Sequence, residues 1–442
     1  MAQLIPLEEY ITQVLEALSP LEGAHAALDE AHGRILAEDV TAAVPVPPWT
    51  NSAMDGYAVR AAETSGASSQ APVVLPVADD VPAGAAPVPL APGTAQRIMT
   101  GAMLPEGADA VVKVEDTDQA PGPHPIPERV EIRAEAWPGL NVRRIGEDVR
   151  AGDPVMAAGT RLSAAAVSAL ASVGLGSVPL APRVRVAVVS TGTELRDVGE
   201  ALTPGTIPDS NGLLLAGLVA EHGAECVSTA RSGDTAEELA LVLRRAAASA
   251  DLIVTSGGVS AGAFDPLTML AEANRGEDAP VHLDFVKVAM QPGKPQGHGW
   301  VLADDGRRVP IICLPGNPVS VFTTFHMYVA GVLAVMSGLV APEHGATVPS
   351  AITARARVGW DSPRGKTQFI PLCFVDEAGE RADDVLSYDR RGGEAWVAPV
   401  HPLGSKSHLV ASLARARAVG VVPPECEAVT PGQELAVVPL VG

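Results

Sequence analysis

Four short loops in the second half of the chain carry most of the residues that could do chemistry. They read STGTEL (190–195), TSGGVSAGAFD (255–265), AMQPGKP (289–295) and CLPGNP (313–318), and each follows a run of apolar, β-type residues. Parallel strands end at one edge of their sheet, and ligands bind beyond that edge. The sequence therefore predicts that the four loops meet at one site.

Two of these loops have features that suit the binding of phosphate or another oxyanion. Ser256, Gly257 and Gly258 at a strand end can turn backbone N–H groups toward a phosphate, although Gly-Gly also makes ordinary turns. Asn317 is a good N-cap and Pro318 suits the first helical position, so the positive end of a helix would point at the sheet edge. A simple helix start explains that pair equally well. The chain contains neither the P-loop nor the dinucleotide-binding glycine pattern at these loops.

Charged residues accompany the loops. Lys287 and Lys294 bring positive charge to the same edge, and Glu194 and Asp265 bring carboxylates. Loop lysines are often only solvated, which is the alternative for both. Carboxylates beside phosphate-binding loops favour Mg²⁺, which is typically held by one or two carboxylates plus substrate oxygens.

A second group of candidate residues lies in the first half of the chain. In NSAMDGYAV, Asp55 and Gly56 stand between apolar residues, the strongest short signal for a hairpin turn in which glycine takes a positive φ. A turn that presents a carboxylate to a ligand is the alternative. RIMTGA and NVRRIGEDV add Thr100 and Asp148, the latter also explicable as part of a solvated turn.

Length and composition limit the classes of protein. The chain has 442 residues, 47% of them hydrophobic and 19% charged, which predicts about three folded domains. Its net charge of -21 would repel a nucleic-acid backbone, so an anionic ligand needs local positive charge. The four cysteines are far apart among apolar neighbours, typical of reduced, buried thiols in a cytoplasmic protein. Glu8 and Glu9 stand where a signal peptide needs an apolar core.

Hydrophobic periodicity predicts the elements that position the loops. Residues 7–40 look helical, and residues 41–160 have the turns and short strands of a β-rich domain. From 183 onward strands alternate with helices, one of them opened by the capping box Thr235-x-x-Glu238, which predicts a doubly wound α/β sheet. Residues 319–340 are apolar and uncharged, and we interpret them as a buried core helix rather than a membrane span. Strands after 345 predict a final β-barrel or small sandwich.

The motifs taken together resemble one family. NSAMDGYAV, RIMTGAMLPEGADAVV, NVRRIGEDV, AGTRLS, STGTEL, SGGVSAG, MQPGKP and LPGNPVS occur in the order and at the approximate spacing of the MoeA family, the molybdopterin molybdenumtransferases, which include the gephyrin E domain. The resemblance runs from about residue 5 to 440. It implies an α/β multidomain fold with four regions: an elongated linker domain (1–44 and 147–180), a β-rich domain (45–146), a MogA-like doubly wound molybdopterin-binding domain (181–340) and a C-terminal β-barrel domain (341–442).

The resemblance also implies an activity. Members insert molybdate into adenylylated molybdopterin in the presence of Mg²⁺ and release AMP and molybdenum cofactor. They are cytoplasmic homodimers whose cleft combines the α/β and C-terminal domains of one subunit with the β-rich domain of the other. The implied partners are the pterin nucleotide and the oxyanion, with a MogA-type adenylyltransferase and molybdoenzymes as candidate protein partners, and neither nucleic acid nor a membrane.

Site residues carry over position by position. The resemblance implies that Asp55 lies in the active cleft, so we expect its turn to present a carboxylate. The catalytic candidates are Asp55, Thr100, Asp148, Glu194, Asp265, Lys287 and Lys294, with Asp55, Glu194 and Asp265 as Mg²⁺ ligands. The candidates for binding the pterin nucleotide are Ser190, Thr191, Gly192, Asp209, Asn211, Ser256, Gly257, Gly258, Ser260, Pro315, Gly316, Asn317, Pro318 and Ser407.

The chain departs from the family pattern at a few positions, and two other functions stay open. Thr50, Gln291 and Arg417 differ from the common family residues, and Lys366 or Arg364 is the candidate for a family arginine. One alternative is a molybdopterin adenylyltransferase, because the α/β domain resembles the MogA type, although that type lacks the β-rich domain and the barrel. The other is a gephyrin-like scaffold without catalysis.

Overall fold

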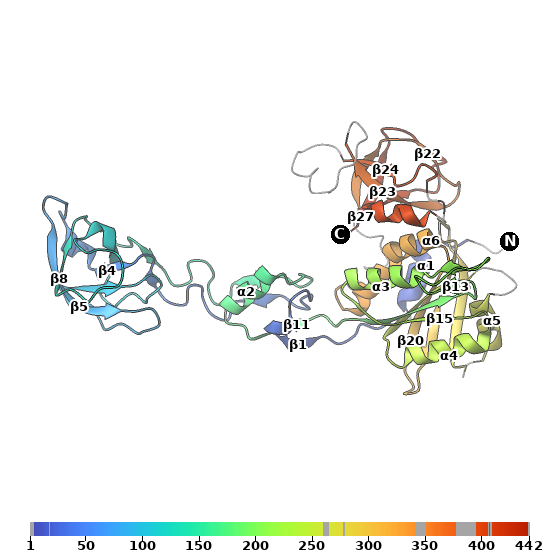
Figure 1. The fold of residues 1–442 in the computed structure, drawn as a ribbon, viewed down its shortest axis with the longest axis horizontal. Helices are drawn as coiled ribbons and strands as arrows, with labels where there is room; N and C mark the ends of the chain where they lie inside the picture. The colour runs from blue at the N-terminus through green and yellow to red at the C-terminus, as the bar shows by residue number, and fades with distance from the viewer. Residues whose placement is uncertain are drawn as a thin grey trace. The chain divides into compact units, whose positions relative to one another are not determined.

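The computed structural model of the protein describes residues 4–16, 18–259, 265–276, 279–340, 351–376, 395–404, 406 and 409–440. The chain forms two units, shown with their elements in Figure 1. The larger unit comprises residues 1–24 and 181–442, and the smaller comprises residues 25–180. Each unit has its own cores and is described by itself.

A six-stranded sheet forms the centre of the larger unit. Its order is β15 (Glu225–Ser232), β12 (Arg185–Thr191), β16 (Leu252–Ser256), β20 (Arg308–Leu314), β19 (Pro295–Leu302) and β17 (Val281–Lys287). The first four strands are parallel, whereas β19 runs antiparallel to both neighbours. The predicted doubly wound α/β domain is confirmed. The pattern did not predict β19, because glycines interrupt its apolar alternation.

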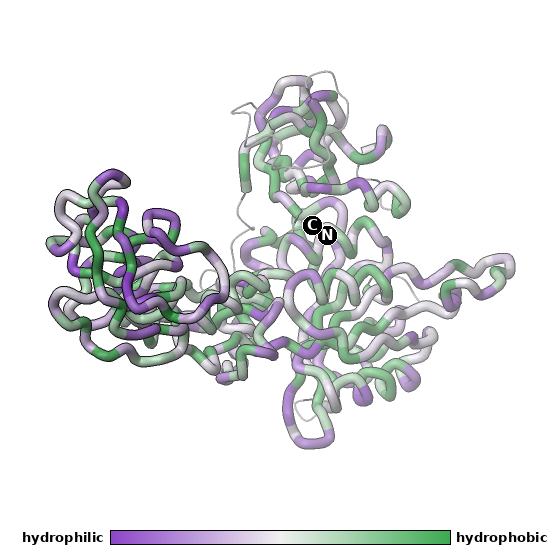
Figure 2. Tube along the Cα trace, turned by 60° about the vertical axis from the view of Figure 1, so that its left-hand side comes forward, coloured by the Kyte–Doolittle hydropathy of each residue, from purple (hydrophilic) through white to green (hydrophobic). Residues whose placement is uncertain are grey.

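Helices cover both faces of this sheet (Figure 1). α3 (Asn211–Glu221) packs on β12 and β15 from one face. On the other face α4 (Ala236–Ala247) packs on β12, β15, β16 and β19, and α5 (Pro266–Ala273) packs on β17 and on α4. β12 shows why two cores form, since alternate side chains of a strand point to opposite faces. Val186 and Val188 join the core beneath α3, whereas Ala187 and Val189 join the core beneath α4. In Figure 2 much of this interior is coloured as hydrophobic.

The N-terminal helix is shorter than predicted. α1 (Leu7–Glu16) buries one face, including Tyr10 and Ile11, in the core beneath α3. The helical prediction is wrong for the described residues from 18 to 40, which form β1 (Ala24–Ala27), the 3₁₀ turn η1 (Leu28–Glu30) and the start of β2 (Val40–Thr41). Pro20 and Gly33, the latter with φ of +75°, are incompatible with a continuous helix.

The long apolar helix is buried. It consists of α6 (Pro318–Thr324), the π-helical turn η4 (Phe325–Val329) and α7 (Ala330–Met336). Among the described residues this is the one helix long and apolar enough to cross a membrane, and 83% of its most apolar window lies inside the structure. A core helix passes the same test, and the predicted core position is confirmed.

The C-terminal region closes into a barrel. β21 (Ile352–Ala356), β24 (Trp396–Pro399), β23 (Thr367–Val375), β25 (Ala418–Val422) and β27 (Glu434–Pro439) pair in a ring. The short pair β22 (Trp360–Asp361) and β26 (Ala428–Val429) and the 3₁₀ turn η5 (Val410–Arg415) complete the region. The predicted barrel is confirmed. β18 (Met290–Gln291) pairs with the start of β23, which joins the barrel to one of the four loops.

The smaller unit contains a β-rich part and a second cluster. A five-stranded sheet has the order β7 (Ala110–Lys113), β4 (Gly56–Val59), β6 (Ala95–Ile98), β5 (Val73–Val81) and β8 (Arg129–Ile132). β3 (Asn51–Ser52) pairs with β9 (Val142–Arg143), and the 3₁₀ turns η2 (Ala61–Thr64) and η3 (Val114–Asp116) lie between strands. The second cluster contains α2 (Ala164–Ser172), with β1 paired to β11 (Ser177–Leu180) and β2 paired to β10 (Pro154–Met156).

The hairpin turn predicted at Asp55 and Gly56 is wrong. β4 starts at Gly56 and pairs with β6 and β7 rather than with β3, and Gly56 does not have a positive φ. A Cβ at this position would overlap the carbonyl oxygen of Val112. Glycine therefore allows a close approach of two strands.

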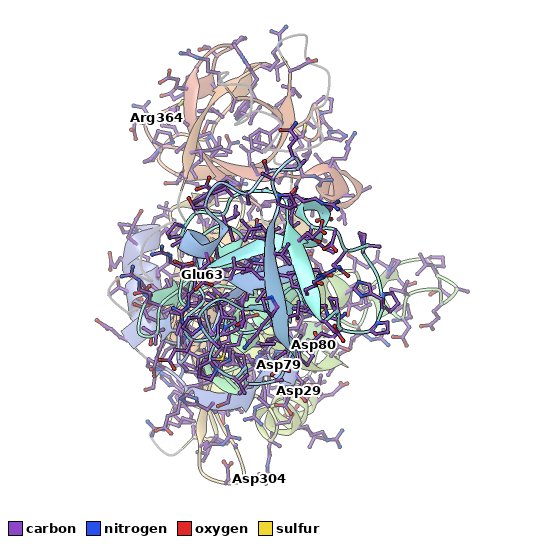
Figure 3. All side chains as sticks on the ribbon, turned by 90° about the vertical axis from the view of Figure 1, so that its left-hand side faces the viewer. Asp29, Glu63, Asp79, Asp80, Asp304 and Arg364 are labelled. Atoms are coloured by element: carbon purple, nitrogen blue, oxygen red, sulfur yellow. The ribbon has the colours of Figure 1, made fainter. Side chains whose placement is uncertain are left out.

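Charged side chains lie at the periphery of both units. Figure 3 shows this for Asp304 and Arg364 of the larger unit. The strong net negative charge is thus mostly solvated, as burial of unpaired carboxylates is costly.

Candidate functional site

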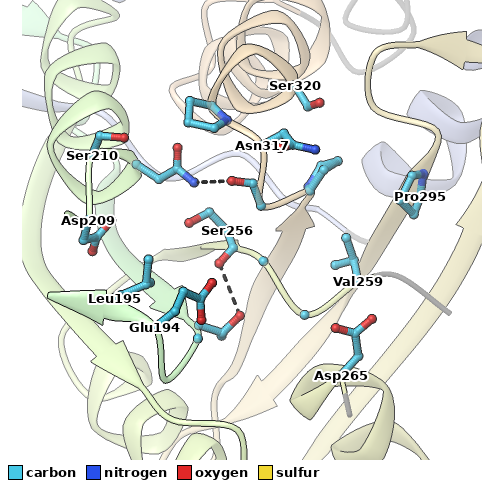
Figure 4. A pocket seen from close by; sticks show the side chains of 18 of the residues that line it. Glu194, Leu195, Asp209, Ser210, Ser256, Val259, Asp265, Pro295, Asn317 and Ser320 are labelled. Atoms are coloured by element: carbon cyan, nitrogen blue, oxygen red, sulfur yellow. Dashed lines mark hydrogen bonds between the residues drawn. The ribbon is translucent and has the colours of Figure 1, made fainter. Parts of the chain in front are cut away.

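A cavity opens at the carboxyl edge of the parallel strands. β12 and β16 lie side by side in the middle of the parallel strands. β15, the next strand of this sheet after β12, lies on the far side of β12, whereas β20 lies on the far side of β16. A crevice forms where the strand order reverses in this way. The cavity of about 650 Å³ found there is lined by residues of all four loops (Figure 4). Its size suits a small organic ligand.

The glycine-rich loop packs tightly against its neighbours. Thr191 Oγ1 donates a hydrogen bond to the carbonyl oxygen of Ser256 at 3.3 Å. Gly257 has φ of +93°, and a Cβ there would lie 2.7 Å from Thr191 Oγ1 and 2.8 Å from its carbonyl oxygen. Gly316 of the fourth loop also lies close to Gly257, whose Cα would be 3.3 Å from a Cβ on Gly316. The backbone at the cavity floor is therefore held where no side chain could fit.

The fourth loop is held by an asparagine from α3. Asn211 Nδ2 donates to the carbonyl oxygen of Gly316 at 2.7 Å. Asn211 Oδ1 is buried without a hydrogen-bond partner in the described part of the chain, so it is an acceptor that a ligand can satisfy. Asp209 Oδ1 accepts from the backbone N–H of Gly212 at the start of α3. Asn317 is the N-cap residue of α6, where its side chain makes no capping hydrogen bond, and it lines the same wall of the cavity as Ser320 (Figure 4).

The cavity is rich in carboxylates. Glu194 and Asp265 lie on the side away from Asn317, on either side of the loop that carries Ser256 (Figure 4). The Glu194 carboxylate folds over Gly192, where a Cβ would overlap it. Asp209 also lines the cavity.

Asp234 is a further lining carboxylate that the sequence reasoning missed. Its Oδ2 accepts a hydrogen bond from Thr193 Oγ1 of the STGTEL loop at 2.5 Å. It follows β15, which ends at Ser232. The rule that placed the other loops at this edge could therefore have found it.

The donor set matches the way Mg²⁺ is usually bound. The described residues contain no cluster of three or more His, Cys, Asp or Glu side chains that could enclose a metal. Glu194 and Asp265 nevertheless line one cavity, and Mg²⁺ usually takes one or two carboxylates with substrate oxygens and water completing its shell. The cavity thus fits a cation that arrives with a phosphate ligand.

Some sequence-predicted residues of the larger unit lie outside the lining. Ser190 is buried beneath the cavity, where it accepts a 3.5 Å hydrogen bond from Ser256 Oγ. Lys287 ends β17 and does not line the cavity, whereas Lys294 does. Ser260 and Ser407 lie outside the described residues.

The residues that depart from the family pattern have clear positions. Lys366 Nζ donates to Oε1 of Gln291 at 3.5 Å, and Gln291 lines the cavity. Arg364 instead forms an exposed ion pair with Glu427 at 3.3 Å. Of the two candidates for the family arginine, Lys366 is therefore the one beside the cavity. Arg417 donates to neighbouring backbone carbonyl groups.

The smaller unit positions the other candidates. Asp55 Oδ1 accepts two hydrogen bonds from Thr100, one from the backbone N–H at 2.6 Å and one from Oγ1 at 2.7 Å. These bonds, the backbone one first, lower the pKa of Asp55. Asp55 also lines a separate cavity of about 440 Å³ with Tyr57 and Arg97. Asp148 is exposed and outside that lining.

Comparisons with known proteins cover nearly the whole chain. Residues 5–174 match the MoeA N-terminal region (domain I and II), residues 187–334 match a probable molybdopterin binding domain, and residues 386–440 match the MoeA C-terminal region (domain IV). Molybdopterin molybdenumtransferase 2 of Mycobacterium tuberculosis is 43% identical over 387 residues, which cover 86% of this chain and 89% of the relative. Molybdopterin molybdenumtransferase of Nostoc is 39% identical over 311 residues, covering 70% of this chain and 68% of the relative.

The fold is also found in solved structures. The molybdopterin biosynthesis MoeA protein of Pyrococcus horikoshii superposes with a TM-score of 0.75 at 29% identity over the full length of both chains. Another solved structure of a molybdopterin biosynthesis MoeA protein from Pyrococcus horikoshii gives a TM-score of 0.70 at 26% identity, covering 99% of this chain and 100% of the other. With its domains in the same order and this level of identity to curated relatives, the chain belongs to the MoeA family, the molybdopterin molybdenumtransferases.

Proposed function

We propose that the protein inserts molybdate into adenylylated molybdopterin in the presence of Mg²⁺, with release of AMP and molybdenum cofactor. It is a transferase of molybdenum cofactor biosynthesis, like the relatives that share its domains. The observation that carries the finer proposal is the composition of the cavity. A glycine-rich backbone suited to phosphate lies next to several carboxylates.

The balance of charge explains why a divalent cation is needed. Four carboxylates line the cavity, those of Glu194, Asp209, Asp234 and Asp265. Among the described lining residues, Lys294 supplies the one ammonium group. A pyrophosphate-linked nucleotide would be repelled by that excess of negative charge. Bound Mg²⁺ would neutralise it and polarise the phosphoanhydride. Glu194 and Asp265 are the residues that would hold the metal.

The chain's own residues would mainly position the reactants. The backbone N–H of Gly258 would bind a phosphate oxygen, because that of Gly257 already donates to the carbonyl oxygen of Leu314 at 3.0 Å. Lys294, which lines the same cavity, would bind an anionic group. Asn211 Oδ1, buried and unpartnered among the described residues, would accept a hydrogen bond from a hydroxyl or amino group of the nucleotide. An oxygen nucleophile must attack the phosphoanhydride so that AMP leaves, and molybdate must reach the dithiolene sulfurs. Both steps need positioning and charge neutralisation rather than a protein nucleophile.

Asp55 has the properties of a carboxylate that stays ionised. Thr100 holds its pKa below the ordinary value, so it is a negative charge and a hydrogen-bond acceptor at neutral pH. The family resemblance supports a role for Asp55 in the reaction. It also supports a homodimer and a cytoplasmic location for this protein. Sedimentation of the purified chain tests the dimer.

The test of the function measures AMP release from adenylylated molybdopterin by chromatography. We expect release that requires both molybdate and Mg²⁺ and falls about 10²- to 10³-fold in Glu194→Gln and Asp265→Asn. Asp304→Asn is the control, because Asp304 is an exposed carboxylate that pairs with Arg244 at the surface and such pairs contribute little. A wild type that binds the nucleotide without turnover would support the scaffold instead. Consumption of ATP with free molybdopterin would support the adenylyltransferase.

A further inference from the structure

A fully buried glutamine lies beneath the loop that carries Lys294. Gln296 has no exposed surface. Its Nε2 donates a 2.6 Å hydrogen bond to the carbonyl oxygen of Gly293, and its Oε1 accepts a 2.8 Å hydrogen bond from the hydroxyl of Tyr328. Both ends of the side-chain amide are thus occupied.

The loop above the glutamine has little freedom. Gly293 has φ of +99°, and its surroundings include the methyl group of Thr324 and Nε2 of Gln296. The carbonyl oxygen of Lys294 accepts a 2.8 Å hydrogen bond from the backbone N–H of Val288. Residues 291–295 line the cavity. The hydrogen bond from Gln296 to Gly293 therefore restrains the backbone one residue before Lys294, whose side chain carries the ammonium group.

Tyr328 fixes which way the amide points. A glutamine amide can rotate by half a turn and exchange its donor and acceptor. The Tyr328 hydroxyl stays protonated, since burial raises its pKa, and so it donates to Oε1. Nε2 is then left to face Gly293. Tyr328 itself lies in the π-helical turn η4 (Phe325–Val329), a local widening that redirects side chains and is often found near functional sites.

Burying the hydrogen-bonded side chains of Gln296 and Tyr328 costs more free energy than burying two apolar side chains at these positions. A buried amide without partners is strongly unfavourable, so its retention needs every group satisfied. An apolar side chain of similar volume would fill the space but could not hold the Gly293 carbonyl. We propose that Gln296 and Tyr328 are positioning residues that preset the Lys294 loop in the conformation in which its ammonium meets the anionic part of the substrate. The role of Lys294 rests on the proposed function, whereas the restraint on its loop does not.

The variants to compare are Tyr328→Phe and Gln296→Met, with Tyr10→Phe as the matched control. Tyr10 stacks edge-on to Tyr328 with ring centroids 5.4 Å apart. Its buried hydroxyl donates to the carbonyl oxygen of Gly297 at 3.1 Å, which belongs to the strand rather than to the loop. The Tyr10 and Tyr328 hydroxyls also interact with each other, so this control removes a neighbouring buried hydroxyl while both direct bonds of Gln296 stay in place.

The decisive readout is a double-mutant cycle on AMP release. We expect kcat/KM to fall about three- to tenfold in Tyr328→Phe, with a Tm close to that of Tyr10→Phe, which keeps near wild-type kcat/KM. In a Lys294→Ala background the Tyr328→Phe change should have no further effect, because it acts through Lys294. An equal loss in both backgrounds would overturn the inference, as would an equal loss in Tyr10→Phe.

Amide hydrogen exchange tests the restraint without turnover. We expect the Val288 amide, whose partner is the Lys294 carbonyl, to exchange faster in Tyr328→Phe and Gln296→Met than in Tyr10→Phe. Unchanged exchange would refute the restraint even in an active enzyme. Faster exchange in a protein that never releases AMP would leave the restraint standing while the proposed function fails.

Discussion

Substitution of Gly192 by alanine tests whether Glu194 must occupy its observed position. Gly192 has φ of +142°, and an added Cβ would overlap the Glu194 carboxylate, so that carboxylate must move. Strained backbone of this kind costs about 1–3 kcal/mol in the free energy of unfolding. A displacement of about 1 Å in a group that positions the reaction costs about 10²-fold in rate. We therefore expect a folded protein with about one hundredth of the wild-type AMP release.

The matched control is Gly205→Ala. Gly205 lies in the segment that follows the same loop and has φ of +88°, but no described atom lies within 4 Å of the position its Cβ would take. It imposes a comparable backbone strain without displacing the carboxylate. Thermal unfolding and AMP release are measured for both variants. Equal activity in the two, at equal Tm, would refute the reasoning that Glu194 acts from its observed position.

Replacement of Thr100 by valine removes one of the two donors to Asp55, so we expect the pKa of Asp55, followed by carboxyl NMR titration, to rise toward its ordinary value; no change would show that the hydroxyl contributes nothing. Burial lowers the pKa of His326 to about 3, so between that pH and about 6.5 the unfolded chain binds a proton that the folded chain does not. The free energy of unfolding should fall with acidification across this window by up to about 1.4 kcal/mol per pH unit. In His326→Phe, followed by urea unfolding at several pH values, the free energy of unfolding should depend less steeply on pH; the same pH dependence as in the wild type would contradict the lowered pKa of His326. Gly257→Ala places a Cβ against Thr191 and should weaken AMP binding about 10- to 100-fold by calorimetry, whereas unchanged affinity would argue against a phosphate at this loop.

Periodicity was sufficient for the parallel half of the central sheet. The apolar runs of β12 and β16 and the capping residue Thr235, whose side chain accepts from the Glu238 N–H, are local signals that agree with the tertiary structure. The loops at the strand ends were located by the same reasoning, because the edge at which they meet follows from strand direction alone.

The remaining features depend on contacts between distant segments. Gly56 was expected in a tight turn, but its role is the approach of Val112, 56 residues later in the chain, which no short window reveals. The buried bond from Gln296 to Gly293 depends on Tyr328, which is brought over the loop by a different helix. A single sequence does not reveal which distant residues are in contact, so it cannot indicate such pairs.

The central claim is that molybdenum enters the pterin as AMP leaves. The most direct measurement is the molybdenum content of the pterin product, by elemental mass spectrometry, against the AMP released in the same reaction. We predict equal molar amounts of both, with neither formed when molybdate or Mg²⁺ is withheld. AMP released without molybdenum in the product, or molybdenum-free product at every molybdate concentration, would contradict the account.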